Sequence, residues 1–271
     1  MPEKKEQKII VLLSLLPSDK ALILNGIKIA SIFRKEICLC YNVQKKQKKN
    51  YNQLKAKLTE YANPVKNKIP GLKISTLLLS EHVKDLPEKL SDDSEAIFMI
   101  APKSDFKKYS PALAESPVPF LFIDEKQETV PGYKRMVLPI DLRKENSDSA
   151  IWSSYFGRFN NTGIVVVAAN DKNSENKKQV TQNVVLTKKL FQKFGLQHKI
   201  FKGRKNSLGI TDEALKLALS MDIDVMAILG SSTITPLDLL VGLPEKRIIR
   251  HSGKLPVLII NPRKDNYILC D

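Results

Sequence analysis

The residue types of a phosphate-binding loop occur together in residues 228–261, which read ILGSSTITPLDLLVGLPEKRIIRHSGKLPVLIIN. An apolar, strand-like run leads into Gly230, a Ser/Thr-rich loop follows, and Gly242 stands just before a helix-like segment. Strand, glycine and helix in this order can cradle phosphate, because backbone N–H groups and the helix N-terminus point at the anion. Nucleotide binding is therefore the first chemistry that the sequence indicates.

Leu243 and Pro244 weaken this prediction. Leu243 stands where a hydroxyl donor would be useful, and Pro244 removes a backbone N–H at the helix start, although proline suits a first helical turn. Hydroxyl and basic side chains nearby could retain some affinity for an anion. They are Ser231, Ser232, Thr233, Thr235, Lys246 and Arg247. The candidate site is polar but degraded.

Other catalytic or metal chemistry is not indicated. The three histidines, at positions 82, 198 and 251, are scattered and lack metal-ligand spacing, and a helix-capping role is favoured for His251. Cys38 and Cys40 would share one face of a strand, where burial is favoured over a metal site. The sequence contains no Walker loop, nucleophile elbow or pair of catalytic carboxylates. We therefore expect a protein that is not an enzyme and holds no metal.

Composition indicates a globular protein of one or two domains. The chain has 271 residues, of which 42% are apolar and 27% are charged. Apolar runs such as residues 9–16 are far shorter than the roughly 20 residues of a membrane span, so we expect no membrane association. Acidic residues near the N-terminus argue against a targeting signal, which favours a cytoplasmic protein.

The net charge of +15 raises the question of nucleic-acid binding. The densest basic run, residues 45–49, lacks the aromatic residues of a base-stacking surface. No helix-turn-helix, zinc-finger or RNA-recognition signature is visible. A solvated, lysine-rich face is the favoured interpretation, and specific nucleic-acid binding is the alternative.

Internal repetition organises the chain. Three apolar segments recur in the same order at offsets of roughly 125 to 140 residues. Residues 8–16 parallel 134–142, residues 95–102 parallel 225–232, and residues 116–124 parallel 253–261. This pattern predicts a tandem duplication. The polar connection over residues 125–134 contains Pro131-Gly132, so we expect one domain over residues 1–125 and a second over residues 133–271.

The second copy alternates apolar strands with amphipathic helices. Strands are expected at residues 135–140, 163–169, 197–201, 224–229 and 256–260. Helical periodicity links Val180, Val184, Thr187, Phe191 and Phe194, and also Ile210, Ala214, Leu217, Ala218 and Met221. The first copy has an equivalent stripe at Tyr51, Leu54, Leu58, Tyr61 and Val65. This alternation predicts an α/β fold with parallel sheets covered on both faces and right-handed crossovers.

The second copy resembles the universal stress protein family, and the whole chain resembles its tandem two-domain members. The likeness rests on MVLPIDL at residues 136–142, DVMAILGSS at residues 224–232 and VGLPEKRIIRHSGKLPVLIIN at residues 241–261. Over residues 8–124 it rests on strand order and the repeat. The resemblance implies two tandem doubly wound, Rossmann-like sheets, each with five strands in the order 3-2-1-4-5 and a ligand site between strands 1 and 4.

The resemblance also implies a nucleotide site in the second domain. In ATP-binding members the aspartate that matches Asp141 holds the adenosine end, and the loop after the fourth strand holds phosphate. The candidate site residues are therefore Asp141, Gly230, Ser231, Ser232, Thr233 and Gly242. For Asp141, a role in a turn or at a helix start is an equal alternative.

The family's phosphate signature is glycine, two residues, glycine, nine residues, glycine and a hydroxyl residue. Alignment on Gly230 or on Gly242 matches only one of these glycines and puts Leu243 at a required position. The additional Cβ atoms hinder close approach of the backbone to phosphate. The first copy has no glycine between residues 100 and 122, so we expect no nucleotide site there.

These observations favour a non-enzymatic universal stress protein that acts through contacts with protein partners, has a degraded nucleotide cleft and needs no cofactor. The alternative is a stress-response switch that still binds ATP or another nucleotide. Two apolar segments, residues 118–124 and 256–261, are expected to pair as fifth strands within one chain, because exposed apolar edges invite aggregation. A homodimer is expected from apolar residues on the helices of the first domain, namely Ile27, Ile32 and Phe33.

Overall fold

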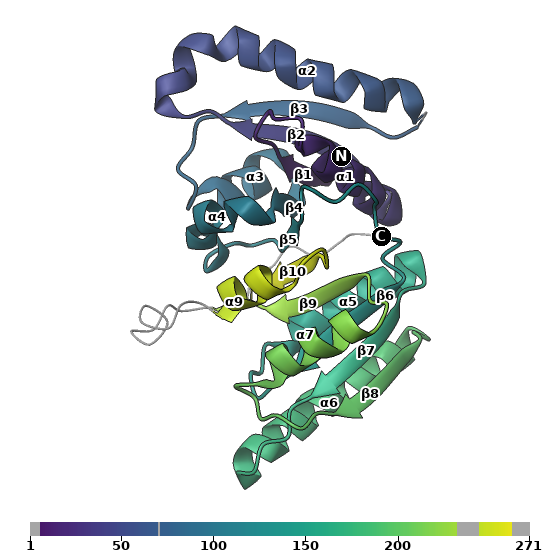
Figure 1. Cartoon of the computed structure of the whole chain (residues 1–271). Helices are drawn as coiled ribbons and strands as arrows, with labels where there is room; N and C mark the ends of the chain where they lie inside the picture. The colour runs from purple at the N-terminus through teal and green to yellow at the C-terminus, as the bar shows by residue number, and fades with distance from the viewer. Residues whose placement is uncertain (1–5, 70, 232–243, 262–271) are drawn as a thin grey trace, which may run out of the picture. The chain divides into compact units, whose positions relative to one another are not determined.

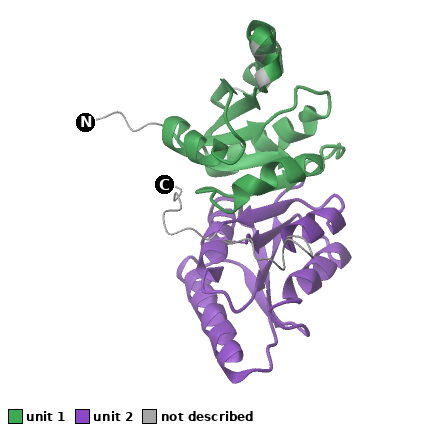
Figure 2. Ribbon diagram, turned by 90° about the vertical axis from the view of Figure 1, so that its left-hand side faces the viewer, with its two compact units in different colours: residues 1–130, 265–271 green, residues 131–264 purple. Residues whose placement is uncertain are grey.

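The computed structural model (Figure 1) describes residues 6–69, 71–231 and 244–261. These residues form two compact units (Figure 2), the first ending at Val130 and the second beginning at Pro131. The boundary lies within the polar connection that contains Pro131-Gly132. Each unit is an α/β sandwich of its own.

Unit 1 contains a parallel sheet in the order β3-β2-β1-β4-β5. Its strands are β1 (Lys8–Leu12), β2 (Glu36–Asn42), β3 (Ile74–Leu79), β4 (Ala96–Pro102) and β5 (Phe120–Ile123). Its helices are α1 (Asp19–Phe33), α2 (Tyr51–Lys68), α3 (Leu86–Ser94) and α4 (Phe106–Leu113), with short 3-10 segments η1 (Lys45–Asn50) and η2 (Lys103–Asp105).

Unit 2 repeats this topology, because its parallel strands follow the order β8-β7-β6-β9-β10. The strands are β6 (Arg135–Ile140), β7 (Gly163–Ala168), β8 (His198–Lys202), β9 (Val225–Leu229) and β10 (Val257–Ile260). The helices are α5 (Asn146–Asn160), α6 (Ser174–Lys193), α7 (Ile210–Ser220) and α9 (Pro244–His251). The predicted fold class is therefore confirmed, with strand order 3-2-1-4-5 in each unit.

Burial explains why these apolar runs form central strands. All residues of β4, β5, β9 and β10 are buried, whereas β3 and β8, at the end of each order, are largely half-exposed or exposed. Right-handed crossovers place α5 and α6 on one face of the unit 2 sheet and α7 and α9 on the other (Figure 1). The strands are thus covered on both faces, as continuous apolar sequences require.

Pro139 lies inside the central strand β6, where a proline removes one ladder hydrogen bond. It pairs in register with Val167 of β7, but the ladder between β6 and β9 covers only Met136 and Val137. Pro139 therefore lies beyond the last pair between β6 and β9, so its missing N–H takes no hydrogen bond from that ladder. The two strands are unpaired at this end of the sheet, where the candidate site lies.

The predicted strands of unit 2 agree with the structure to within one residue at each end. The predicted stripes are only partly core, because Leu58, Val180 and Ala214 are buried while Phe194 and Met221 are exposed. A homodimer was expected because Ile27, Ile32 and Phe33 are apolar residues on helices of the first domain. This reason is wrong for Ile32 and Phe33, since both are buried inside unit 1. The pairing of residues 118–124 with 256–261 concerns one unit against the other and stays a prediction.

Candidate functional site

The structure brings Asp141 and Gly230 to the same end of the unit 2 sheet, after the neighbouring strands β6 and β9. The side chain of Arg143 joins them. Its Nε lies 2.8 Å and its Nη2 2.7 Å from Asp141 Oδ2, while its Nη1 donates to the Gly230 carbonyl oxygen at 3.3 Å. A guanidinium of the chain itself therefore bridges the predicted switch point.

Asp141 is only 6% exposed, and both of its carboxylate oxygens are occupied. Oδ2 accepts from the Arg143 guanidinium, and Oδ1 accepts from the Arg143 backbone N–H at 2.8 Å and from Asn146 Nδ2 at 2.9 Å. The bond from Asp141 to the N–H two residues on is the Asx-turn arrangement that fixes a tight loop. In this geometry Asp141 has its partners inside the β6–α5 loop.

Two asparagines hold the backbone of the same loop. The Nδ2 of Asn146 donates to the carbonyl oxygens of Asp141 and Arg143 at 3.0 and 2.5 Å. Asn183, on α6, donates to the same two oxygens at 2.9 and 2.8 Å. Hydrogen bonds from α5 and α6 thus fix the loop, including the backbone of Arg143.

Glu245 supplies a buried carboxylate at the phosphate side of the site. It lies in the first turn of α9 and is 3% exposed. Its Oε1 accepts the backbone N–H of Ser231, and its Oε2 has no hydrogen-bond partner among the described residues. A negative charge is favoured at a helix N-terminus by the helix dipole. The Ser231 N–H and the start of α9 thus stabilise a carboxylate of the chain itself.

These groups surround a cavity of about 280 Å³. Its lining comes from the loops after β6 and β9, from the segment before α7 and from α9. It includes Asp141, Arg143, Ser207, Thr211, Ser231, Glu245 and Arg247, with apolar walls from Ile228, Leu229 and Ile248. The volume is at the lower limit of small-molecule sites, which span roughly 300–1,000 Å³.

Of the predicted site residues, Asp141 and Ser231 line this cavity, and the carbonyl oxygen of Gly230 accepts from Arg143. Ser232, Thr233 and Gly242 lie outside the described residues, as does Leu243. Arg143 and Glu245 were not predicted. The available signals in the sequence were the position of Arg143, two residues after the candidate aspartate, and that of Glu245, directly after Pro244.

In unit 1 the loop after β1 is held by Asp19, the first residue of α1, which is 1% exposed. Its carboxylate accepts the backbone N–H groups of Ser14 and Leu16, each at 3.1 Å at the closest oxygen. Burial raises the pKa of Asp19 above its usual value. After β4, burial lowers the pKa of Lys103 to about 8.

Metal chemistry and membrane insertion find no support within the described residues. They contain no group of three or more His, Cys, Asp or Glu side chains placed to hold a metal ion. Cys38 and Cys40 are buried on β2, and burial raises the pKa of Cys38 to about 11. Among the described helices, none combines the length and apolar character needed to cross a bilayer.

The sequence matches no protein-family model and no curated protein. Among solved structures, the chain is similar to a universal stress protein from Archaeoglobus fulgidus, with a TM-score of 0.68, 13% identity, and coverage of 96% of this chain and 98% of that one. A putative universal stress protein from Pseudomonas aeruginosa gives 0.62 and 15%, with coverage of 95% and 94%. A protein of unknown function from Pseudomonas aeruginosa gives 0.56 and 14%, with coverage of 95% and 93%.

These similarities show the fold. The chain has the universal stress protein fold, and its near-complete coverage of the two universal stress proteins is compatible with a tandem arrangement. At 13% to 15% identity they transfer no activity and no ligand.

Proposed function

We propose that this protein is a non-enzymatic stress-response protein that acts through contacts with other proteins. In this proposal the switch-point cleft of unit 2 is lined by charged groups of the chain that take up the ligand's contacts, and it binds no nucleotide at physiological strength. The stress-response part rests on the fold shared with universal stress proteins. The observation that carries the closed cleft is the buried carboxylate of Glu245 on the Ser231 N–H.

Glu245 opposes phosphate binding in two ways. It takes up the Ser231 N–H that a phosphate oxygen would otherwise use. It also places a negative charge beside the position of the phosphates. Two unit charges 4 Å apart interact by about 4 kcal/mol at an effective dielectric constant of 20. Because 1.4 kcal/mol corresponds to about tenfold in affinity, a repulsion of this size would weaken phosphate binding by roughly a thousandfold.

Arg143 opposes binding at the adenosine end. Its guanidinium contacts both Asp141 and the Gly230 carbonyl, so a nucleoside could reach Asp141 only by displacing it. Displacement would leave a buried carboxylate without its cation, and breaking such a pair costs about 3–5 kcal/mol where both partners are buried. Arg143 is half-exposed, so its pair with Asp141 lies below that range.

The non-enzymatic part is supported by how three of the acidic groups near the cleft, other than Glu245, are used. Asp141 is paired with Arg143, Asp171 accepts from the Ser207 hydroxyl at 2.6 Å, and Asp212 is paired with Arg247. A general base needs a carboxylate that faces substrate and is free to take a proton. These three carboxylates instead hold loops and helices together.

Native mass spectrometry of the purified full chain tests this proposal. We expect a chain of 30.6 kDa without any nucleotide mass, both as purified and after incubation with Mg-ATP followed by buffer exchange. The alternative, a nucleotide-dependent switch, predicts an added nucleotide mass on a large fraction of the molecules. That result would refute the closed cleft, and conversion of the bound nucleotide to product would refute the absence of catalysis.

A further inference from the structure

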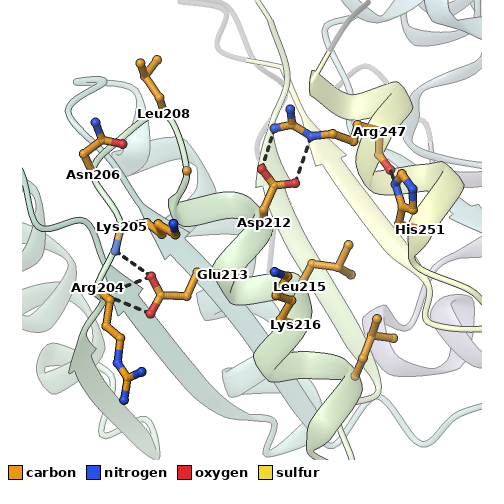
Figure 3. A pocket seen from close by; sticks show the side chains of 12 residues that line it. Arg204, Lys205, Asn206, Leu208, Asp212, Glu213, Leu215, Lys216, Arg247 and His251 are labelled. Atoms are coloured by element: carbon orange, nitrogen blue, oxygen red, sulfur yellow. Dashed lines mark hydrogen bonds and ion pairs between the residues drawn. The ribbon is translucent and has the colours of Figure 1, made fainter.

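Exposed apolar side chains gather around α7 in unit 2. They are Phe201 (47% exposed), Leu208 (86%), Leu219 (54%) and Met221 (43%). They line two adjoining cavities of about 1190 and about 530 Å³, which share Glu213 and Lys216. We call these two cavities with their lining side chains the α7 groove. Figure 3 shows the larger cavity, with Leu208 and Leu215 labelled.

The two carboxylates of the larger cavity are already occupied by the chain. Asp212 accepts two hydrogen bonds from the Arg247 guanidinium, at 2.9 and 2.6 Å. Glu213 accepts the backbone N–H groups of Arg204 and Lys205 at 2.8 to 3.0 Å (Figure 3). Both carboxylates therefore serve to fix α7 against α9 and against the loop after β8.

Basic side chains also line the groove. Four of them form no ion pair within the described part of the chain: Lys202, Arg204, Lys205 and Lys216. Positive charge next to exposed leucines is complementary to a surface that is acidic and apolar at once. Most monomeric proteins expose apolar side chains singly, and a gathered set marks an interaction site.

We propose that the α7 groove binds an acidic, amphipathic segment of another protein. Apolar side chains of that segment cover Leu208 and Leu219, and its carboxylates face the basic side chains of the groove. This inference rests on the proposed function, because it assigns a surface to the protein contacts. The chain's net charge of +15 disfavours a second copy as the occupant, since two copies repel each other.

The size and chemistry of the groove favour a peptide segment over other ligands. The larger cavity exceeds the roughly 300–1,000 Å³ of small-molecule sites. Single-stranded nucleic acid would need several aromatic side chains for base stacking, and among the described residues of the groove Phe201 is the one exposed Phe, Tyr or Trp. Aliphatic side chains such as Leu208 and Leu219 instead suit the apolar face of a helix laid into a groove.

Selection from a random peptide library displayed on phage, with the full chain as the target, tests the proposal. We expect selected peptides to combine Asp or Glu with Leu, Ile or Phe. The strongest, made synthetically with a fluorescent label, should bind in an anisotropy titration and weaken with added salt. Leu219→Asp and Lys216→Glu should each lower its affinity by about tenfold or more.

Matched control variants lie on α6. Leu186→Asp replaces a leucine that is 59% exposed, and Lys188→Glu reverses an exposed lysine outside the groove. Both should bind the peptide as the wild type does. Equal losses in the control and groove variants would overturn the proposal, because the binding would then follow net charge or general hydrophobicity. Selection of basic peptides, or of none, would overturn it as well.

Titrations with an oligonucleotide and with Mg-ATP distinguish the peptide groove from a nucleic-acid surface and from the nucleotide cleft. The groove is a nucleic-acid surface, and the proposal is wrong, if a single-stranded oligonucleotide binds, Lys216→Glu abolishes the oligonucleotide binding and no selected peptide binds.

Mg-ATP should leave the peptide affinity unchanged. A peptide that binds only with Mg-ATP would refute the closed cleft but keep the groove, whereas failure of the peptide with an empty cleft refutes the groove alone.

Discussion

At the scale of single residues, two charged side chains determine what the cleft can hold. Glu245 places a carboxylate on the Ser231 N–H, and Arg143 places a guanidinium on Asp141. Glu245 carries the same sign of charge as a phosphate, and Arg143 occupies the carboxylate that a nucleoside would need. In the proposed function, these two side chains take the positions that a nucleotide would need.

Neutralising Glu245 should restore affinity for phosphate-like anions. Glu245→Gln keeps the shape and an acceptor for the Ser231 N–H but removes the charge. We expect inorganic phosphate to raise the Tm of this variant more than that of the wild type, because the repulsion is gone and the helix dipole of α9 remains. Glu175→Gln, an exposed change of the same charge on α6, is the control. Equal phosphate responses in all three proteins would contradict the role given to Glu245.

Lys103 should give the stability of the protein a pH dependence. Burial lowers its pKa from 10.5 to about 8, so between these values the unfolded chain holds a proton that the folded chain has lost. The free energy of unfolding should therefore rise with pH across this window, by at most ~1.4 kcal/mol per pH unit from this group. Urea titrations at several pH values should show a smaller rise in Lys103→Met. An identical slope in both proteins would show that Lys103 is not the group responsible.

At the scale of elements, close packing of helices on the sheet outweighs helix propensity. Gly26 lies in α1, and a Cβ added there would be 2.5 Å from Val11 Cγ2 and 2.9 Å from Ile37 Cδ1. Helix α1 can lie this close to β1 and β2 only because the position lacks a side chain. Gly157 in α5 is also closely packed, since an added Cβ would be 2.9 Å from Cδ1 of Leu196, in the connection between α6 and β8.

Gly26→Ala should destabilise the protein although alanine is the better helix former. Propensity alone predicts a gain of about 1 kcal/mol, whereas overpacking of a filled core costs about 1–3 kcal/mol. We expect a lower urea midpoint with an unchanged m-value. Ser31→Ala, at an exposed position of the same helix, should change the free energy of unfolding by less than about 0.5 kcal/mol. A stabilised Gly26→Ala variant would show that α1 is free to move away from the sheet.

The elements were more predictable from sequence than the site. Buried parallel strands appear as continuous apolar runs, and their order brought Asp141 and Gly230 together. The contacts of Arg143 and Glu245 were not predictable in the same way. An acidic residue in a first helical turn is ordinary, and Arg143 lies in a polar run, so neither is distinguished until the chain folds. Asn183 reaches the loop from α6, a separation that no local pattern reveals.

At the scale of the whole molecule, two units share one topology but differ in what they expose. In unit 1 the buried Asp19 closes the loop after β1, and in unit 2 the exposed apolar and basic groups gather around α7. The two units thus share one framework, and the α7 groove belongs to unit 2. This arrangement fits a protein whose partners are other proteins.

Isothermal titration of the full chain with Mg-ATP at moderate salt tests the central claim most directly. We expect no saturable binding in the wild type below about 1 mM, because the chain itself contacts the Ser231 N–H and Asp141. A variant with Thr233→Gly, Leu243→Ser and Glu245→Gln should bind measurably more tightly than the wild type. Saturable wild-type binding with a Kd below about 50 μM, abolished by Asp141→Ala, would contradict the account.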